Sequence, residues 1–392
     1  MPFPPLWKVG RELDRIRVKL VLLASRHLYE PIRKPIYDLT ARRRQRLTPG
    51  NLPLTDRVAV FLVYQPGGVA RSIFLTLDHL RQNGFSVLVV SNGPLRPEDR
   101  DTLAAQAALV MERPNVGYDF GAYRDGIRHL WSLNHAMSRL VLMNDSTWFP
   151  LRRDDDSLAR MEALGADLAG HIFKTEEERS RKHDHMESHL LMISQRFLQS
   201  DAFRSFWSRY AMSDHRATTI KYGEKGFSQT AIRSGMKLAS LMGREWLLAT
   251  LRGLDDAELR VVFDMTNDSY RARQKNAAHI RDAAARGLPW RDDFLNWVDK
   301  ALRSSRTFLI SSTFVAPALI YGRMGFAKKA NDIRFHMARE ELLELEARGM
   351  IPPLADEVHA EVSQMVRTWV PPKGAEHVVR QRTQLPAHVG QE

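Results

Sequence analysis

The chain has 392 residues, of which 44% are hydrophobic and none is cysteine, and it carries a formal charge of +12. That length suits two or three domains of ~150 residues each and a sizeable hydrophobic core. The lack of cysteine excludes disulfide bonds, thiolate metal sites and a cysteine nucleophile. The apolar runs are too short for a secretory signal or for the ~20 residues that span a bilayer, so we expect a cytoplasmic protein without a transmembrane helix.

The positive charge is concentrated in the first fifty residues, which hold twelve Lys/Arg against four Asp/Glu. Within this arm an apolar stripe follows helical spacing, and basic side chains fall on another face of the predicted helix. The stripe consists of Leu13, Ile16, Leu20 and Leu23, and the basic face of Arg11, Arg15, Lys19 and Arg26. This pattern is typical of helices that lie on anionic lipid, although a solvated helix packed on its own domain fits equally well. Binding to nucleic acid rests on the high pI alone, because no binding motif is present.

From residue 57 onward the pattern predicts alternating strands and helices. The apolar runs are short and rich in valine, whereas the segments between them repeat apolar residues at helical spacing. This succession implies a parallel sheet with helical crossovers, and helices dominate from about residue 201. The predicted strands are 57–64, 86–90, 109–112, 140–143 and 166–173, and the predicted helices are 71–83, 98–108, 203–210, 228–241, 246–251, 292–302 and 327–348.

Three polar turns follow predicted strands, at the edge where open α/β sheets bind their ligands. They are Ser91-Asn92-Gly93, the segment 115–124 and Asn144-Asp145-Ser146. We therefore expect these turns to lie close together and to form a binding site.

The second turn, in the sequence NVGYDFGAYRDGI, leads into a predicted helix. Gly117 and Gly121 permit positive φ or a close backbone approach, and we expect Asp119 to cap the helix. A helix N-terminus with Arg124 in its first turns suits a diphosphate. The alternative is structural, with Asp119 only as a cap and Arg124 only as a partner of Asp125.

A histidine cluster at 183–189 invites a zinc interpretation. His185 and His189 stand at the i, i+4 spacing of helical metal ligands, with His183 close by. The order His-Glu-x-x-His is absent, however, so we favour a packing role for His189.

Four segments, taken in order, resemble one family. NVGYDFGAYRDG, LVLMNDSTWFPL, HMESHLLMISQRFLQSDAFRSFW and YGEKGFSQTAIRSG are similar to segments of the rhamnan synthesis protein F family of bacterial polysaccharide glycosyltransferases. The similarity covers roughly residues 57–241, with a looser echo in GRMGFAKKANDIR at 322–334. The order of the turns also resembles the donor half of GT-A glycosyltransferases.

This resemblance implies a GT-A-like α/β fold, with a mostly parallel sheet sandwiched by helices. The domains we expect are a basic amphipathic N-terminal arm (1–50), the transferase domain (51–245), a helical C-terminal region (246–370) and a disordered tail (371–392). We expect a cytoplasmic enzyme, and the basic arm with its apolar stripe predicts that the enzyme is peripheral on the inner face of the inner membrane. The donor would be a nucleotide-diphospho-sugar, with dTDP-rhamnose favoured, and the acceptor a lipid-linked or polymeric glycan; no nucleic acid is expected.

The resemblance also assigns roles to residues. Glu224 is expected to be the general base of an inverting transfer, with Asp125 as the second choice and His185 as the third. His185 and Ser188 would lie on the acceptor side. The donor would be bound by Asn92, Asn115, Gly117, Asp119, Arg124, Asn144, Asp145 and Ser146.

The acidic turn departs from the wider GT-A pattern, because Asn144-Asp145-Ser146 has one carboxylate where Asp-x-Asp has two. Asp145 with diphosphate oxygens can still hold Mg²⁺ or Mn²⁺, and a metal-independent site neutralised by Arg124 is equally open. The single acid also keeps a second hypothesis open, that of a non-catalytic, membrane-surface component of polysaccharide assembly.

Overall fold

The computed structural model describes residues 28–175, 184–266, 271–304 and 309–371, together with 16, 17, 20, 23 and 24. The chain divides into two compact units. The first takes residues 1–145, 161–170 and 182–239, and the second takes 146–160, 171–181 and 240–392. The predicted tail beyond residue 371 and His183 lie outside the described residues.

The first unit is built on four parallel strands in the order β4-β3-β2-β5. Their side chains are buried along almost the whole length, as expected for parallel strands covered on both faces. Antiparallel neighbours flank them, with β1 beside β4 and β9 between β5 and β7. The predicted α/β class is confirmed. The strands are β1 (Arg46–Pro49), β2 (Arg57–Val63), β3 (Ser86–Ser91), β4 (Leu109–Glu112), β5 (Arg139–Asn144), β7 (Leu168–Lys174), β8 (His185–Met186), β9 (Leu190–Ser194) and β10 (Leu238–Gly243).

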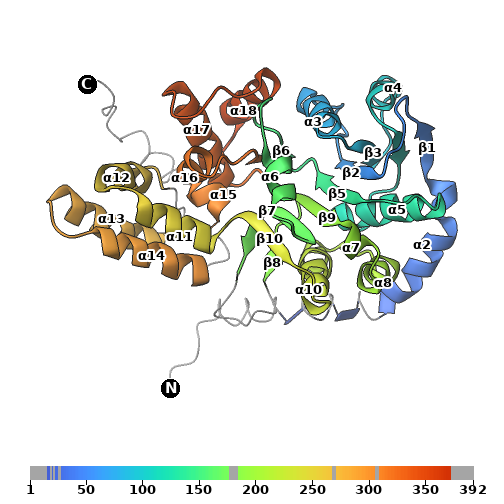
Figure 1. Cartoon of the computed structure of the whole chain (residues 1–392), viewed down its shortest axis with the longest axis horizontal. Coiled ribbons are helices and arrows are strands. Elements are labelled where there is room, and N and C mark those ends of the chain that lie inside the picture. The colour runs from blue at the N-terminus through green and yellow to red at the C-terminus, as the bar shows by residue number, and fades with distance from the viewer. Residues whose placement is uncertain are drawn as a thin grey trace. The chain divides into compact units, whose positions relative to one another are not determined.

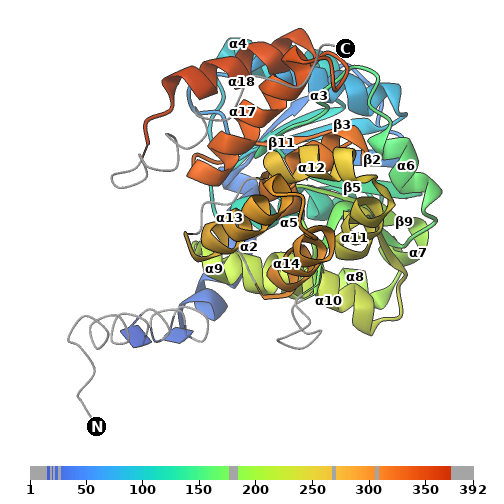
Figure 2. The same ribbon diagram turned by 90° about the vertical axis from the view of Figure 1, so that its left-hand side faces the viewer.

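Helices cover both faces of the parallel strands (Figures 1 and 2). The connections α3 and α4 lie over one face, and α5 lies over the other, where α8 packs against it. The helices of this region are α3 (Arg71–Gln82), α4 (Pro97–Gln106), α5 (Tyr118–Ser132), α6 (Ser157–Ala163), α7 (Gln195–Leu198), α8 (Asp201–Arg209), α9 (Arg216–Thr218), η4 (Thr219–Glu224) and α10 (Lys225–Arg233). Of these, α3, α4, α5 and α8 lie where a helix is predicted, whereas α6, α7, α9 and η4 are not predicted.

One predicted helix of this region is wrong in part. The helix predicted at 228–241 ends at Arg233, because Gly235 has φ of +70°, and residues from Leu238 form the strand β10 instead.

The two histidines at i, i+4 spacing do not lie on a helix. His185 lies in β8, and His189 immediately precedes β9. The zinc interpretation, which the sequence already disfavours, therefore also lacks the helix that would place both side chains on one face.

The predicted N-terminal arm contains a helix that belongs to the first unit, α2 (Glu30–Arg44). Its Tyr37 is 3% exposed and donates a hydrogen bond to the Asp125 carboxylate at 2.5 Å. Asp38 pairs with Arg124 at 2.8 Å. One face of α2 is thus part of the core, and most of the arm before residue 28 lies outside the described residues.

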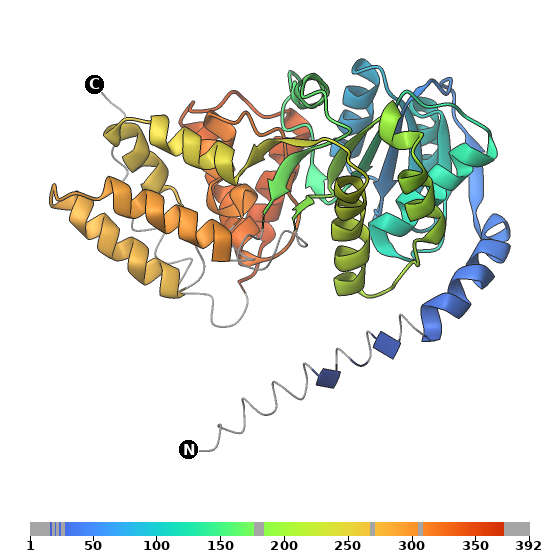
Figure 3. The same ribbon diagram turned by 60° about the horizontal axis from the view of Figure 1, so that its bottom comes forward.

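The second unit is mainly helical (Figure 3). It also holds a two-stranded antiparallel sheet of β6 and β11, which lie far apart in the sequence. The predicted helix 327–348 starts late, at Ile333, because the Asp332 side chain accepts from the Arg334 N–H and caps the helix there. None of the helices in the described ranges is long and apolar enough to cross a membrane. The elements are β6 (Thr147–Trp148), β11 (Ala327–Lys328), α11 (Arg244–Gly253), α12 (Asp256–Asp264), α13 (Arg271–Ala285), α14 (Arg291–Ser304), α15 (Ile310–Thr313), α16 (Val315–Ile320), α17 (Ile333–Ala347) and α18 (Asp356–Thr368).

Candidate active site

The loops that follow the parallel strands meet at one edge of the sheet, as the strand order requires. Asp145 comes directly after β5, and its Oδ2 accepts hydrogen bonds from the Tyr64 main-chain N–H at 2.8 Å and from Gln65 Nε2 at 2.7 Å. Tyr64 and Gln65 come directly after β2. The carboxylate of Asp145 is therefore fixed by the neighbouring loop.

The turn at 115–118 has a backbone conformation that few residues adopt. Gly117 has φ of +79° and Tyr118 has φ of +51°, two successive residues in the left-handed region. A Cβ on Gly121 would lie 2.0 Å from the Val116 carbonyl oxygen, so only glycine fits there. Asn92 supports the turn by donating to the Tyr118 carbonyl at 3.2 Å. Strained backbone of this kind is concentrated at binding sites.

Asp119 lies in the first turn of α5, and the N-cap residue is Gly117, so the predicted capping role of Asp119 is wrong. Its Oδ2 instead accepts a hydrogen bond from Asn144 Nδ2 at 3.2 Å. This contact joins two of the three predicted turns, those at 115–124 and 144–146.

The Asp119–Asn144 pair is one cluster of the site. The predicted base and acceptor-side residues form a second cluster. Glu224 Oε2 accepts from the Ser188 hydroxyl at 2.6 Å and from the Ser188 N–H at 3.1 Å. Glu224 Oε1 lies 3.4 Å from His185 Nε2. The Glu224 side chain is 20% exposed, so solvent reaches this carboxylate even though it is held in place. Because the serine hydroxyl donates to the carboxylate, Ser188 orients Glu224 and is not activated by His185.

Tyr123 joins the two clusters, although its sequence position predicts only a place on the apolar face of α5. Its hydroxyl donates to the Ser188 carbonyl at 3.2 Å and is hydrogen-bonded to the Asn144 side chain. Burial raises the pKa of Tyr123 well above its usual value, and the nearby carboxylates of Asp119, Asp145 and Glu224 raise it further. The phenol therefore stays protonated at neutral pH.

Two predicted site residues have structural contacts instead. Arg124 is fully buried, and its guanidinium binds Asp38 of α2 and the Trp207 carbonyl, at 2.8 and 3.2 Å. Asp125 is bound by Arg113 at 2.6 Å and by Tyr37. Neither side chain faces solvent. The structure therefore does not support the predicted phosphate contact of Arg124 or the predicted second-choice base role of Asp125.

The other residues predicted to bind the donor do not contact the two clusters through any bond described above. Asn115 is exposed at the turn, and Asn92 is buried with its Oδ1 bound by Arg113. Ser146 is exposed and belongs to the second unit. Within the part of the chain that the structure describes, no three His, Asp or Glu side chains gather as a metal cluster. A cation would therefore depend on one or two carboxylates and on ligand oxygens.

Comparison with known proteins shows the family. A family model described as rhamnan synthesis protein F matches residues 87–250. The uncharacterized protein y4gN of Sinorhizobium fredii is 31% identical over 257 residues, 66% of this chain and 67% of that protein. The chain belongs to the rhamnan synthesis protein F family.

Three solved structures align with part of this chain. A putative nucleotide-diphospho-sugar transferase from Desulfovibrio desulfuricans G20 covers 48% of this chain, with 80% of its own chain aligned, 12% identity and a TM-score of 0.29. The mannosyltransferase Ktr4p from S. cerevisiae covers 47%, with 68% of its own chain, 10% identity and a TM-score of 0.26. A structure of Ktr4p in complex with GDP covers 42%, with 63% of its own chain, 10% identity and a TM-score of 0.23.

Proposed function

We propose that this protein is an inverting glycosyltransferase that moves a sugar from a nucleotide-diphospho-sugar to a bacterial cell-surface glycan. Rhamnose is the sugar we favour. Membership of the rhamnan synthesis protein F family supports the reaction class. The observation that carries the proposal is the meeting of the Asp119–Asn144 pair and the Glu224–Ser188–His185 cluster at Tyr123. dTDP-rhamnose as donor, and a lipid-linked or polymeric glycan as acceptor, are parts of this proposal.

The cluster on Glu224 suits proton removal from an acceptor hydroxyl. As the acceptor oxygen bonds to the anomeric carbon, its proton passes to a carboxylate oxygen of Glu224. The bond from the anomeric carbon to the diphosphate breaks, and the nucleoside diphosphate leaves with the electron pair. Ser188 fixes Glu224 from one side and His185 contacts its other oxygen, so the base is oriented before the substrate binds.

The charges near the donor turns favour a divalent cation. The carboxylates of Asp119, Asp145 and Glu224 all raise the pKa of Tyr123. Arg124, the one arginine predicted to contact the diphosphate, is buried and bound to Asp38. Asp145 would hold Mg²⁺ or Mn²⁺ together with diphosphate oxygens, and Asp119 is the second carboxylate nearby. When bound, the cation would neutralise the charge of the leaving diphosphate.

The test is a transfer assay with a panel of nucleotide sugars on the wild type and on Glu224→Gln. We expect the variant to lose ~10²- to 10⁴-fold in transfer with nearly unchanged donor affinity, because it keeps the size of the side chain but not its basicity. Glu245→Gln, which changes an 85% exposed glutamate, is the control and should stay fully active. EDTA in the same assay tests the cation.

Several outcomes would contradict the proposal. A normally folded Glu224→Gln variant with wild-type transfer removes the base role. No transfer from any donor by the wild type would favour the non-catalytic role in polysaccharide assembly, for which the single acid of the 144–146 turn is the supporting feature.

We also propose that the protein docks on the cytoplasmic face of the inner membrane through the outer face of α2. Leu28, Ile32, Ile36 and Leu39 recur at helical spacing and are 68%, 65%, 53% and 83% exposed. The described members of the predicted stripe, Ile16, Leu20 and Leu23, are likewise exposed. An apolar face on a segment that is rich in arginine and lysine suits an anionic lipid surface, where each basic residue contributes about 1 kcal/mol.

This docking is tested by substitutions rather than by deletion, because removal of residues 1–50 would also remove the buried contacts of Tyr37 and Asp38. Ile32→Glu with Leu39→Glu should weaken sedimentation with phosphatidylglycerol vesicles at least tenfold. Leu133→Glu changes a residue that is 54% exposed on the same unit but outside the stripe, and should bind as the wild type does. Equal vesicle binding by all three proteins would disprove the proposal.

A further inference from the structure

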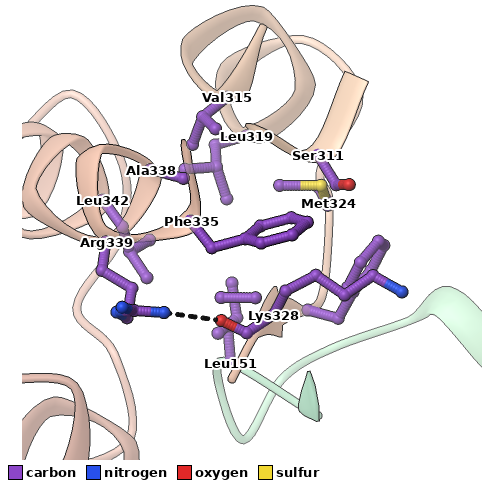
Figure 4. A pocket seen from close by; sticks show the side chains of 12 residues that line it. Leu151, Ser311, Val315, Leu319, Met324, Lys328, Phe335, Ala338, Arg339 and Leu342 are labelled. Carbon is purple, nitrogen blue, oxygen red and sulfur yellow. Dashed lines mark hydrogen bonds between the residues drawn. The ribbon is translucent and has the colours of Figure 1, made fainter. Parts of the chain in front are cut away.

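A pocket of the second unit, between α15, α16, α17 and β11, is too small for a ligand (Figure 4). Its cavity volume is about 10 Å³, room for about one water. The hydrogen bond drawn there, from Arg339 to the Lys328 carbonyl, joins α17 to β11. A group of charges that reaches the proposed donor site lies in the first unit instead.

The loop between α8 and α9 packs on the strained turn at 115–118. A Cβ on Gly117 would lie 2.6 Å from the Met212 Cβ, so the loop comes as close to the turn as only glycine allows. From the same loop, Asp214 contacts both left-handed residues of the turn. Its Oδ1 accepts from the Gly117 N–H at 3.3 Å, and its carbonyl accepts from the Tyr118 hydroxyl at 3.1 Å. Asp214 is therefore placed to hold the turn in its strained conformation.

Asp214 is itself held by an arginine of α2. Arg33 Nη2 donates to Asp214 Oδ1 at 3.0 Å and Arg33 Nη1 donates to Oδ2, so the pairing is bidentate. The Arg33 side chain is 15% exposed, whereas that of Asp214 is 55% exposed. Because a carboxylate this exposed can rotate into water, the arginine fixes the oxygen that accepts from the Gly117 N–H.

A second arginine holds the same turn from the buried side. Arg113 has no exposed side-chain surface, and its Nη2 donates to the Val116 carbonyl at 2.7 Å. Its Nη1 donates to Asn92 Oδ1, and Asn92 in turn donates to the Tyr118 carbonyl. Arg113 also pairs with Asp125 in the core, so its loss would disturb buried charges. The contacts on the side of α2 can be removed with less damage, because they lie near the surface.

We propose that Arg33 and Asp214 are positioning residues that hold the 115–118 turn in the conformation that binds the nucleotide-sugar donor. This role rests on the proposed function, since the turn begins the segment expected to bind the donor. Two successive residues at positive φ are unfavourable on their own and persist only where neighbouring contacts fix them. A turn that is fixed in advance loses less entropy when the donor binds, so the donor binds more tightly. The helix α2 thereby contributes to the donor site as well as presenting its exposed apolar face.

The test is donor binding and transfer by the full chain after these contacts are removed. Asp214→Ala removes the acceptor of the Gly117 N–H, and Arg33→Gln removes the cation that orients it. The donor is dTDP-rhamnose, or the nucleotide sugar of the panel that the wild type uses. In both variants we expect its dissociation constant and KM to rise about tenfold or more, with kcat changed less than about twofold. A merely structural defect would lower the active fraction, and with it kcat, without raising KM.

Lys34→Gln is the matched control. Lys34 is the next residue of α2 and pairs with Asp38 at 3.1 Å, and it makes none of the contacts to the 115–118 turn described above. This variant also loses a charge of α2 from an ion pair, so it matches Arg33→Gln in kind. We expect its donor affinity and its kcat to equal those of the wild type.

Hydrogen exchange of the segment 115–120 examines the turn without depending on activity. Mass spectrometry of the full chain without substrate gives the exchange rate of this segment. We expect it to be about tenfold faster in Asp214→Ala and in Arg33→Gln than in the wild type, because the Gly117 N–H loses its fixed acceptor. The buried strands β2 and β5 should exchange at the wild-type rate in both variants.

The results that overturn this role differ from the result that overturns the proposed function. A wild-type donor KM in both Asp214→Ala and Arg33→Gln overturns the positioning role, and so does wild-type exchange of the segment 115–120 in both. Faster exchange with unchanged donor affinity overturns it as well, because the turn would then be held without effect on the donor. A wild type that neither binds nor uses any donor of the panel contradicts the proposed function, and the donor role of these two residues with it.

Discussion

At the scale of single residues, the site depends on polar side chains that hold one another rather than on any one reactive group. Glu224 has two hydrogen bonds from Ser188, and Asp145 has one each from Tyr64 and Gln65. Both carboxylates are therefore oriented by neighbours before a substrate arrives, which reduces the entropy lost when the reacting groups are brought together. Tyr123 is the residue through which the two halves are connected.

Tyr123→Phe should act on this connection. The variant removes the hydroxyl that donates to the Ser188 carbonyl and leaves that buried carbonyl short of a partner, at a cost of about 1–3 kcal/mol in stability. Because Ser188 orients Glu224, we expect kcat to fall about tenfold or more while the KM for the donor changes little. Steady-state kinetics with the best donor of the panel give both values.

The matched control is Tyr37→Phe, which removes another buried tyrosine hydroxyl, the one bound to Asp125. It should lower the stability without the fall in kcat. If both variants lose activity in proportion to stability, Tyr123 has only a structural role.

The roles of single residues could be predicted from the sequence only in part. Glu224, His185 and Ser188 lie in two of the four family segments, and the structure brings them together. Arg124 is predicted to bind a phosphate because it lies in the first turns of a helix, but Asp38, 86 residues away, pairs with it in the core. Tyr123 lies on the buried side of α5, and helical periodicity cannot tell a phenol that packs from one that also donates a hydrogen bond.

At the scale of elements, the strands of the parallel sheet were predictable, because continuous valine- and leucine-rich runs have few other solutions. No element is predicted for the run Leu190–Ser194, which forms β9. It is five residues long, and a buried run of that length has no periodicity that separates a strand from a helix. The helix predicted at 228–241 is too long. Beyond Arg233 the positive φ of Gly235 redirects the chain, which the helical spacing through residue 241 does not reveal.

The helix α2 shows a further limit of sequence patterns. Its inner face carries Tyr37 and Asp38 into the first unit, while its outer face exposes Ile32, Ile36 and Leu39. Two alternatives that the sequence left open, a membrane-surface helix and a helix packed on its own domain, thus concern opposite faces of one helix. The structure supports the packing directly, and the exposed face supports the docking proposal.

At the scale of the whole molecule, each unit contains a buried histidine that burial keeps uncharged, His79 in the first unit and His171 in the second. Burial lowers the pKa of His79 in the first unit to about 4 and that of His171 in the second unit to about 3. His171 packs between the rings of Phe149 and Phe326, with centroid distances of 5.4 and 4.7 Å. Both folded-state values lie below the ~6.5 expected of an unfolded histidine.

We therefore expect the protein to lose stability on mild acidification. A depressed folded-state pKa stabilises the fold fully above pH ~6.5, and this contribution is lost as the pH falls toward 4 for His79 and toward 3 for His171. At pH 5 each of these two histidines should have lowered the free energy of unfolding of its unit by about 2 kcal/mol. Thermal unfolding between pH 8 and pH 5 measures how steeply the stability falls with pH.

His171→Leu should make this pH dependence weaker for the transition of the second unit. His279→Gln, at an exposed position, is the control and should leave it unchanged. A slope that is the same in the wild type and in His171→Leu would mean that other groups, not this buried imidazole, set the acid sensitivity of that unit.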